Sequence, residues 1–202
     1  MDLEMLRAAS FDELTNILNR RTFILRSQQV ISLCAKRREK VSCLLIDIDD
    51  FKKINDEYGH YAGDIVLVNF VDNLRKSLRN DDLFGRYGGD EFAILLPRAD
   101  ERESVEIAER LRQAIENAIV GADAEIKYTI SIGAATIIPD DGSNESNESN
   151  VDFLYKLSDN ALYSAKARGK NRVVGLAEKC GHNGAAYSGR RDDDGEGFKQ
   201  FS

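Results

Sequence analysis

The chain has 202 residues, of which 42% are hydrophobic and 31% are charged. This composition is typical of one globular domain with short extensions, and it excludes a wholly disordered or fibrous chain. A net charge of −7 argues against nucleic acid as a partner, because binding to its backbone requires a basic surface.

The sequence carries no signal of membrane insertion or secretion. Its longest apolar runs are too short to cross a bilayer, and residues 1–10 contain acidic residues without the apolar core of a secretory signal. The cysteines Cys34, Cys43 and Cys180 are an odd number without metal-binding spacing. They indicate reduced thiols, so we expect a cytoplasmic protein with no membrane contact through this segment.

Hydrophobic periodicity divides the chain into helices and strands. Residues 1–10 are interpreted as a lead, the stub of an upstream signalling helix, residues 11–178 as one domain, and residues 179–202 as a disordered polar tail. Pro139–Asn150 is expected to be a loop. In chain order, the predicted elements are a helix at Arg20–Arg38, a strand at Val41–Ile48, a helix at Asp64–Leu78, strands at Leu83–Tyr87 and Glu91–Leu96, a helix at Val105–Ala118, a strand at Tyr128–Ile137, a helix at Leu154–Ala165 and a strand at Arg172–Leu176.

The order of these elements between residues 41 and 137 is β-α-β-β-α-β, which predicts an α+β fold with a ferredoxin-like sheet flanked by helices. In this arrangement the first two strands run parallel, and the third lies between them in the opposite direction. The hairpin that joins strands two and three therefore lies at the carboxyl end of strand one. We expect Asp47 and Asp49 from that strand to meet Asp90 and Glu91 from the hairpin.

This carboxylate cluster predicts a divalent cation. Asp47 ends an apolar strand, and a buried carboxylate without a counter-charge is costly. Asp90 and Glu91 are anionic and cannot neutralise it. Oxygen ligands without clustered His or Cys favour Mg²⁺ or Mn²⁺, which are commonly held by one or two carboxylates plus substrate phosphates. Asp50 is expected only to cap the turn after the strand, whereas for Asp49 capping and a role in the site both remain open.

Residues near the cluster suggest a phosphate ligand. Gly88 and Gly89 allow phosphates to approach the backbone closely, although two glycines in a hairpin also serve turn geometry alone. Lys166 and Lys170 share one helical face if the helix continues through Gly169, and they could then clamp a polyphosphate. Spacing alone favours the alternative, in which these cations complement the helix dipole.

The hairpin Gly88–Phe92, preceded by Arg86 and Tyr87, resembles the signature of the GGDEF family, the diguanylate cyclases. The resemblance extends from about Phe11 to Val174. Lys170 stands where arginine is frequent in that family, so the positive charge is kept and the planar fork is lost. Other blocks that resemble family motifs are Asp12–Arg21, Asp47–Asp56, Gly59–Asp64, Ser131–Gly133 and Asp159–Asn171.

The resemblance implies a palm-type nucleotidyl cyclase that converts two GTP into cyclic di-GMP and two pyrophosphates. It assigns divalent-metal binding to Asp47, the Ile48 carbonyl, Asp90 and Glu91. It also gives Asp90, Glu91 and Lys52 catalytic roles. For GTP binding it implies the guanine-reading residues Asn55, His60 and Asp64, and the phosphate-binding residues Gly88, Gly89, Lys166 and Lys170.

The resemblance further implies a homodimer, because one domain binds one GTP and the ring closes only between two facing domains. Arg79, Asp82 and Arg110 resemble an inhibitory site for the product cyclic di-GMP, whereas an exposed ion pair is the plain alternative. Two other functions remain open: a silent module that binds GTP or cyclic di-GMP, and a related cyclase with a mixed product. A purely structural dimerisation domain would not explain why Asp47 and Asp90 meet at one edge of the sheet. If it is a diguanylate cyclase, we expect the chain to be the cytoplasmic output domain of a longer sensor protein.

Overall fold

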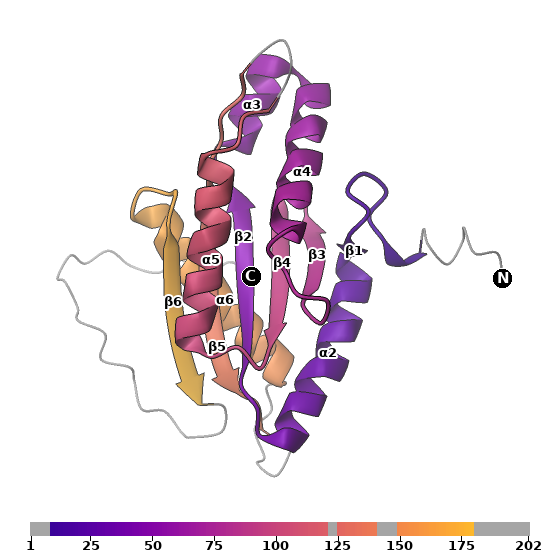
Figure 1. The fold of residues 1–202 in the computed structure, drawn as a ribbon, viewed down its shortest axis with the longest axis vertical. Helices are drawn as coiled ribbons and strands as arrows, with labels where there is room; N and C mark the ends of the chain where they lie inside the picture. The colour runs from indigo at the N-terminus through magenta and orange to yellow at the C-terminus, as the bar shows by residue number, and fades with distance from the viewer. Residues whose placement is uncertain (1–8, 121–124, 141–148, 180–202) are drawn as a thin grey trace, which may run out of the picture.

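The computed structural model describes residues 9–120, 125–140 and 149–179. They form one six-stranded sheet with helices on both faces (Figure 1). The strand order is β1-β3-β4-β2-β5-β6; β1 pairs with β3 and β5 with β6 in parallel, and the other neighbours are antiparallel. The predicted α+β fold is confirmed, including the placement of β4 between β2 and β3. The strands are β1 (Leu18–Asn19), β2 (Val41–Ile48), β3 (Leu83–Gly88), β4 (Glu91–Pro97), β5 (Ile130–Ile138) and β6 (Val173–Lys179).

The prediction of one helix between β2 and β3 is wrong. Two helices occupy this stretch, and they meet at Gly59, whose φ of 84° is readily adopted only by glycine. The first of the two was missed, although Phe51, Ile54 and Tyr58 recur at helical spacing, because a helix of only eight residues gives a weak signal. The two-residue β1 is too short to show any alternation of burial. The helices are α2 (Arg20–Arg37), α3 (Phe51–Tyr58), α4 (His60–Arg75), α5 (Glu101–Glu116) and α6 (Asn150–Ala167).

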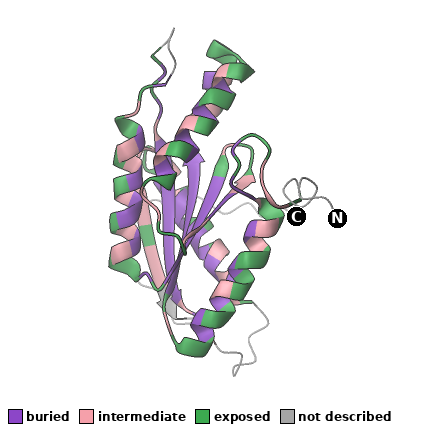
Figure 2. Ribbon diagram, turned by 45° about the vertical axis from the view of Figure 1, so that its right-hand side comes forward, coloured by how far each residue is buried: buried purple, intermediate pink, exposed green. Residues whose placement is uncertain are grey.

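Strand β2 is buried along its whole length (Figure 2). Its side chains alternate between two hydrophobic clusters, as the period of a strand requires. Leu44 and Ile46 pack in the cluster that contains residues of α4 and α5, whereas Cys43 and Leu45 pack in the cluster that contains residues of α2 and α6. The same alternation places Asp47 on the α6 side of the sheet.

Helix α6 lies unusually close to β5. A Cβ atom on Gly133 would be 2.2 Å from the backbone nitrogen of Leu162 and 2.2 Å from the carbonyl oxygen of Ser158. Only glycine allows this approach. The Ser158 hydroxyl also donates to the Cys43 carbonyl on β2 (3.3 Å). This contact fixes α6 against the sheet and so determines where its last turn meets the end of β2.

Several expectations fall on parts of the chain that the structure does not describe. They concern residues 1–8 of the lead, residues 141–148 of the predicted loop, and residues 180–202 of the predicted tail. Strand β6 ends at Lys179, the first residue of that predicted tail. Among the described residues, no helix is long and apolar enough to cross a membrane.

Candidate active site

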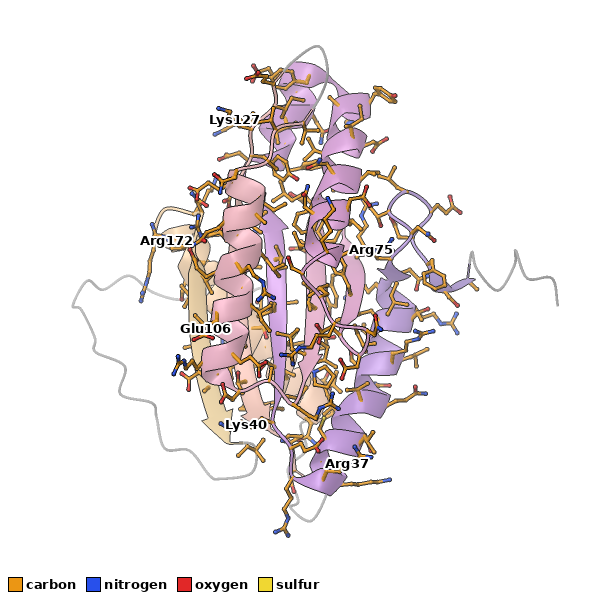
Figure 3. All side chains as sticks on the ribbon, viewed as in Figure 1. Arg37, Lys40, Arg75, Glu106, Lys127 and Arg172 are labelled. Atoms are coloured by element: carbon orange, nitrogen blue, oxygen red, sulfur yellow. The ribbon has the colours of Figure 1, made fainter. Side chains whose placement is uncertain are left out.

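The carboxyl end of β2 and the β3–β4 hairpin form one site. Asp47 lies opposite Glu91 in the β2–β4 register, and the Ile48 N–H donates to the carbonyl oxygen of Asp90 (3.3 Å). The predicted strand order therefore brings together acidic residues that are more than forty positions apart in the sequence. In Figures 1 and 3 this end of the sheet points toward Lys127, and Lys40 marks the opposite end of β2.

Asp47 is the electrostatic centre of the site. It is 9% exposed, and its Oδ2 lies 2.7 Å from the Nζ atom of Lys166. Burial raises the pKa of Asp47; Lys166 opposes this effect, and the negative charges of Asp90 and Glu91 add to it. Because the raising effects outweigh Lys166, the pKa of Asp47 is raised, and its ionised form is disfavoured even with Lys166 beside it.

The donor atoms at this edge suit a hard divalent cation. Among the described residues, no three His, Cys, Asp or Glu side chains are grouped closely enough to hold an ion by themselves. Mg²⁺ does not require such a cage, because it is usually bound by one or two carboxylates together with water and substrate phosphates. Asp47, Asp90 and the Ile48 carbonyl provide oxygen donors of this kind, so they are compatible with the predicted metal.

Asp49 makes structural hydrogen bonds that the sequence did not indicate. It is 6% exposed and accepts hydrogen bonds from the hydroxyls of Ser131 (2.6 Å) and Thr129 (2.7 Å) and from the N–H of Asn171 (3.0 Å). Its two oxygens thus accept from neutral donors at the start of β5, including Thr129 just before the strand, and from the turn after α6. Asp49 therefore ties three segments together at the end of β2.

The expectation that Asp50 caps the turn is wrong. Asp50 precedes α3 with a φ of 56° and makes no side-chain capping hydrogen bond. Its carboxylate pairs instead with Lys53 (2.8 Å) and Lys170 (3.0 Å). These two ammonium groups lower the pKa of Asp50, with Lys53 contributing most.

The helix that carries Lys166 does not continue through Gly169, so the condition for the two lysines to share one helical face is not met. Helix α6 ends at Ala167, and the backbone then turns through positive φ values at Gly169 (107°) and Lys170 (61°). Both lysines nevertheless reach the end of β2, because Lys166 pairs with Asp47 and Lys170 with Asp50. The helix-dipole alternative remains compatible with Lys166, which lies in the last turn, but it does not explain the position of Lys170.

The glycine hairpin has free space next to Gly89, and hydrogen bonds from Arg86 hold its turn in place. A Cβ atom on Gly89 would meet no atom within 4 Å, and Gly89 has a positive φ of 28°. The Arg86 Nε donates to the Gly89 carbonyl (2.9 Å), and its Nη1 donates to the carboxylate of Asp12 (3.1 Å). This brace was not expected, since no sequence periodicity connects residues 74 positions apart.

Hydrogen bonds from Thr15 and Arg86 to Asp12 outweigh the effect of burial, so the pKa of Asp12 is lowered. Asp12 is therefore a strong anionic partner for Arg86. The brace connects the segment before β1 to the turn of the hairpin.

The predicted guanine-reading residues lie on α3 and α4. Asn55 packs on the α4 backbone so closely that a Cβ atom on Gly63 would be 2.0 Å from the Asn55 Oδ1. This contact fixes Asn55 against the first half of α4, where His60 and Asp64 are both exposed. Lys52 is exposed on the first turn of α3. A shallow hollow of about 430 Å³ adjoins Asp64.

Arg79, Asp82 and Arg110 lie near the start of β3, at the opposite end of that strand from the glycine turn. The side chains of Arg79 and Asp82 do not pair directly. The Asp82 carboxylate accepts from the Arg79 backbone N–H (2.7 Å), and the Arg79 guanidinium pairs with Glu103 of α5 (2.6 Å). Arg110 donates to the carbonyl of Ser77 (3.0 Å).

Comparison with known proteins identifies the family. Residues 9–172 match the model described as "Diguanylate cyclase, GGDEF domain". The chain is 39% identical over 167 residues to the probable diguanylate cyclase DgcT of Escherichia coli K12, covering 81% of this chain and 35% of that protein. It is 37% identical over 175 residues to the response regulator PleD of Caulobacter vibrioides, covering 85% of this chain and 37% of that protein. The chain thus spans little more than a third of the length of these two curated relatives.

Solved structures agree with the sequence relatives. The structure resembles the coiled coil and GGDEF domain of DgcB from Caulobacter crescentus, solved in complex with c-di-GMP, with a TM-score of 0.76 and 26% identity. That match covers 86% of this chain and 88% of the other. With a matching fold, a matching domain model and relatives of this similarity, the chain belongs to the GGDEF family of diguanylate cyclases.

Proposed function

We propose that the chain is a diguanylate cyclase that condenses two GTP molecules into cyclic di-GMP and two pyrophosphates, with Mg²⁺ or Mn²⁺ as cofactor. One observation carries this proposal. A buried aspartate, Asp47, lies at the same sheet edge as two further carboxylates and is contacted by the ammonium of Lys166. This alternation of negative and positive groups suits a substrate that brings both a cation and phosphates.

The acidic residues divide the chemistry between them. Asp47, Asp90 and the Ile48 carbonyl would hold the metal, which when bound lowers the pKa of the attacking 3′-hydroxyl and offsets charge at the reacting phosphate. Glu91 pairs in register with Asp47. From that position it would assist at the metal or accept the 3′-hydroxyl proton.

The lysines would bind the triphosphate. Lys166 and Lys170 are each paired with a carboxylate at the end of β2, and phosphates offer them a ligand of greater negative charge. The open backbone at Gly88 and Gly89 would let the phosphates approach, and Lys52 would add positive charge from α3. Positioned charges of this kind are the main source of rate in phosphoryl and nucleotidyl transfer.

Asn55 and Asp64 would select guanine. A carboxylate accepts from the guanine N1–H and its exocyclic amine, and an amide can donate to a guanine acceptor. Asn55 contacts Gly63, the residue before Asp64, so the two residues would contribute to one base-binding site from α3 and α4. The exposed His60, at the start of α4, would line the same subsite.

The need for two GTP molecules per cyclic di-GMP determines the assembly that we propose. One domain holds one GTP, so we propose a homodimer in which two sites face each other and each supplies one nucleotide. Arg79, Asp82 and Arg110 would bind cyclic di-GMP as an inhibitor, since arginine suits bidentate contact with phosphate or guanine. We place residues 11–178 in the cytoplasm as a catalytic output domain, with residues 1–10 as its lead and 179–202 as a tail.

The direct test is product identification. The purified chain is incubated with GTP and Mg²⁺, and the products are identified by mass. Cyclic di-GMP and pyrophosphate support the proposal. Binding of GTP without any product indicates the silent module, and a cyclic product from ATP together with GTP indicates the cyclase of mixed product; either result contradicts the proposal.

A further inference from the structure

The turn between α6 and β6 has an unusual backbone. Gly169, Lys170 and Asn171 have φ values of 107°, 61° and 45°, so three consecutive residues are in the left-handed region. Glycine adopts this region freely and asparagine tolerates it, but lysine does so rarely, because its Cβ crowds the backbone. Such a conformation persists only where the surrounding structure holds it.

Asn171 provides the contacts that hold this turn. Its N–H donates to the Asp49 carboxylate (3.0 Å), its side-chain oxygen accepts from the Arg112 Nη1 (2.7 Å), and its side-chain nitrogen donates to Glu116 (2.8 Å). Asp49 follows β2, and the other two partners lie on α5. One residue therefore connects the turn to the catalytic end of the sheet and to a helix.

The partners of Asn171 are themselves fixed. Asp49 accepts from the hydroxyls of Thr129, just before β5, and Ser131, within it, as described above. The Arg112 side chain is only 12% exposed; its Nε and Nη2 bind Glu109, and its Nη1 binds Glu116 (2.9 Å) as well as Asn171. The planar fork of arginine allows these contacts at the same time, which a lysine cannot reproduce.

Lys170 is the residue that this network places. Its N–H donates to the Ala165 carbonyl (3.1 Å), and its own carbonyl accepts from the Arg172 Nε (3.0 Å). Arg172 lies at the edge of the molecule in Figure 3. With its main chain held on both sides, Lys170 directs its ammonium to the end of β2, 3.0 Å from the Asp50 carboxylate.

We propose that Asn171 is a positioning residue: it holds the backbone of Lys170 so that the lysine ammonium reaches the phosphates of the bound nucleotide, and Arg112 acts through Asn171. This inference rests on the proposed function, in which GTP is the substrate. A purely structural role predicts something different. In that case loss of the contacts lowers the unfolding temperature and leaves the contribution of Lys170 to nucleotide binding unchanged.

The variant Asn171→Gly separates the side-chain contacts from the backbone conformation. Glycine tolerates the left-handed φ and keeps the N–H that donates to Asp49, so only the contacts to α5 are lost. The measurement is the Kd for a non-hydrolysable GTP analogue in the presence of Mg²⁺, with GMP as a ligand that lacks the polyphosphate. We expect the Kd for the GTP analogue to rise about tenfold and the Kd for GMP to stay the same.

A double-mutant cycle with Lys170→Ala tests whether Asn171 acts through Lys170. We expect Asn171→Gly to have no further effect once Lys170→Ala is present. Arg112→Lys is expected to weaken binding in the same way. Its matched control is Arg102→Lys. Arg102 forms an i,i+4 ion pair with Glu106 on the same helix, but it is 88% exposed and forms no hydrogen bond or ion pair with the turn within the described part of the chain. This control is expected to leave the Kd unchanged.

A second pair of variants guards against a folding artefact. Asn171→Asp alone places a carboxylate beside Glu116 and is expected to weaken binding. When Glu116→Gln is added, the new amide at position 116 can donate to the new carboxylate at position 171, so one hydrogen bond is restored in the opposite direction. We expect the Kd for the GTP analogue to return to within about twofold of the wild-type value.

The proposal is overturned if Asn171→Gly raises the Kd for the GTP analogue by the same factor with Lys170 and with Lys170→Ala. The same conclusion follows if Asn171→Gly does not raise this Kd at all. It is also overturned if Lys170→Ala leaves the affinity unchanged, since there is then no phosphate contact to position. Formation of cyclic di-GMP by the wild-type chain is scored separately. An additive cycle in a chain that makes cyclic di-GMP rejects the positioning role and leaves the proposed function standing.

Discussion

The two ends of α5 differ in how their charged side chains are paired: one end has a largely buried network, and the other has an exposed ion pair. Near its carboxyl end, Arg112 is largely buried and belongs to a network that reaches Asn171 and Asp49. Near its amino end, Glu103 makes an exposed ion pair with Arg79, whose side chain is 60% exposed. Residues 103 and 112 are about 14 Å apart along the helix, given a rise of about 1.5 Å per residue.

The difference lies in what each group would lose if its partner were removed. A buried carboxylate or guanidinium without a partner pays the full cost of desolvation, so the network beside β2 must stay intact. An exposed ion pair contributes little to stability and can exchange its partner for a ligand. We therefore expect the end near β2 to be built for fixed geometry, and the end near Arg79 for reversible binding.

The largest expected effect is on catalysis, at Asp47. Asp47→Asn keeps the size of the side chain and removes its charge, and we expect turnover of GTP to fall at least about 1,000-fold, on the order of 4 kcal/mol in the transition state. Steady-state formation of cyclic di-GMP measures this loss. Near-normal turnover would show that Asp47 does not hold the metal.

The same variant also gives a prediction about pH. Because the pKa of folded Asp47 is raised, ionised Asp47 lowers the stability of the metal-free protein as the pH rises through that pKa. Asp47→Asn should therefore unfold at a slightly higher temperature than the wild type at pH 7, and the difference should shrink near pH 4. Thermal unfolding at the two pH values checks the sign.

The next effect is on stability, at Asp49. Asp49→Ala leaves the hydroxyls of Thr129 and Ser131 and the N–H of Asn171 without their shared acceptor. We expect the free energy of unfolding to fall by about 2–4 kcal/mol, measured by urea denaturation. The neighbouring exposed residue supplies the control: Asp50→Asn removes the charge of two surface ion pairs, tolerates the φ of 56° at this position, and should change stability far less. Equal losses would remove the distinction between the buried and exposed groups.

A smaller effect is expected in substrate selection, at Asp64. Asp64→Ala removes an acceptor for the guanine edge and should weaken GTP binding by on the order of 1–3 kcal/mol, with the fold intact because the residue is exposed. The ratio of the affinities for GTP and ATP is the measurement. If both affinities fall equally, Asp64 does not read the base.

The smallest effect on the free protein is expected at Arg79. Arg79→Ala removes an exposed pair, so the unfolding temperature and the initial rate should not change measurably. Its effect should appear only as product accumulates, as reduced inhibition by added cyclic di-GMP in progress curves. Arg102→Ala, which removes another exposed pair on α5, is the control. Unchanged inhibition in Arg79→Ala would mean that its pair with Glu103 is only a surface contact.

Hydrophobic periodicity predicted the parts of the molecule whose burial is regular. The bounds of β2, Val41–Ile48, agree with the prediction, because every residue of that strand is buried and the run is apolar up to Asp47. Strand order then placed Asp47 beside Glu91. The helix α3 was not predicted, because its apolar residues Phe51, Ile54 and Tyr58 recur at helical spacing over only eight residues.

The polar network could not be predicted from periodicity at all. The contacts of Asn171 join residues that are 55, 59 and 122 positions apart, and they depend on a left-handed turn in which neither Lys170 nor Asn171 is glycine. The same holds for the brace between Arg86 and Asp12. Such contacts depend on the assembled fold, whereas the carboxylates at the end of β2 could be placed by topology alone.

We expect Asp47, at the end of β2, and Asp90, in the turn between β3 and β4, to share one divalent cation with the bound nucleotide. The most direct measurement is Mn²⁺ binding, followed by electron paramagnetic resonance, in the presence of a non-hydrolysable GTP analogue. We predict that Asp90→Asn weakens Mn²⁺ binding at least about tenfold, while Glu101→Gln, an exposed carboxylate at the start of α5, leaves it unchanged. Equal Mn²⁺ affinity in the wild type and in Asp90→Asn would show that Asp90 does not bind the cation.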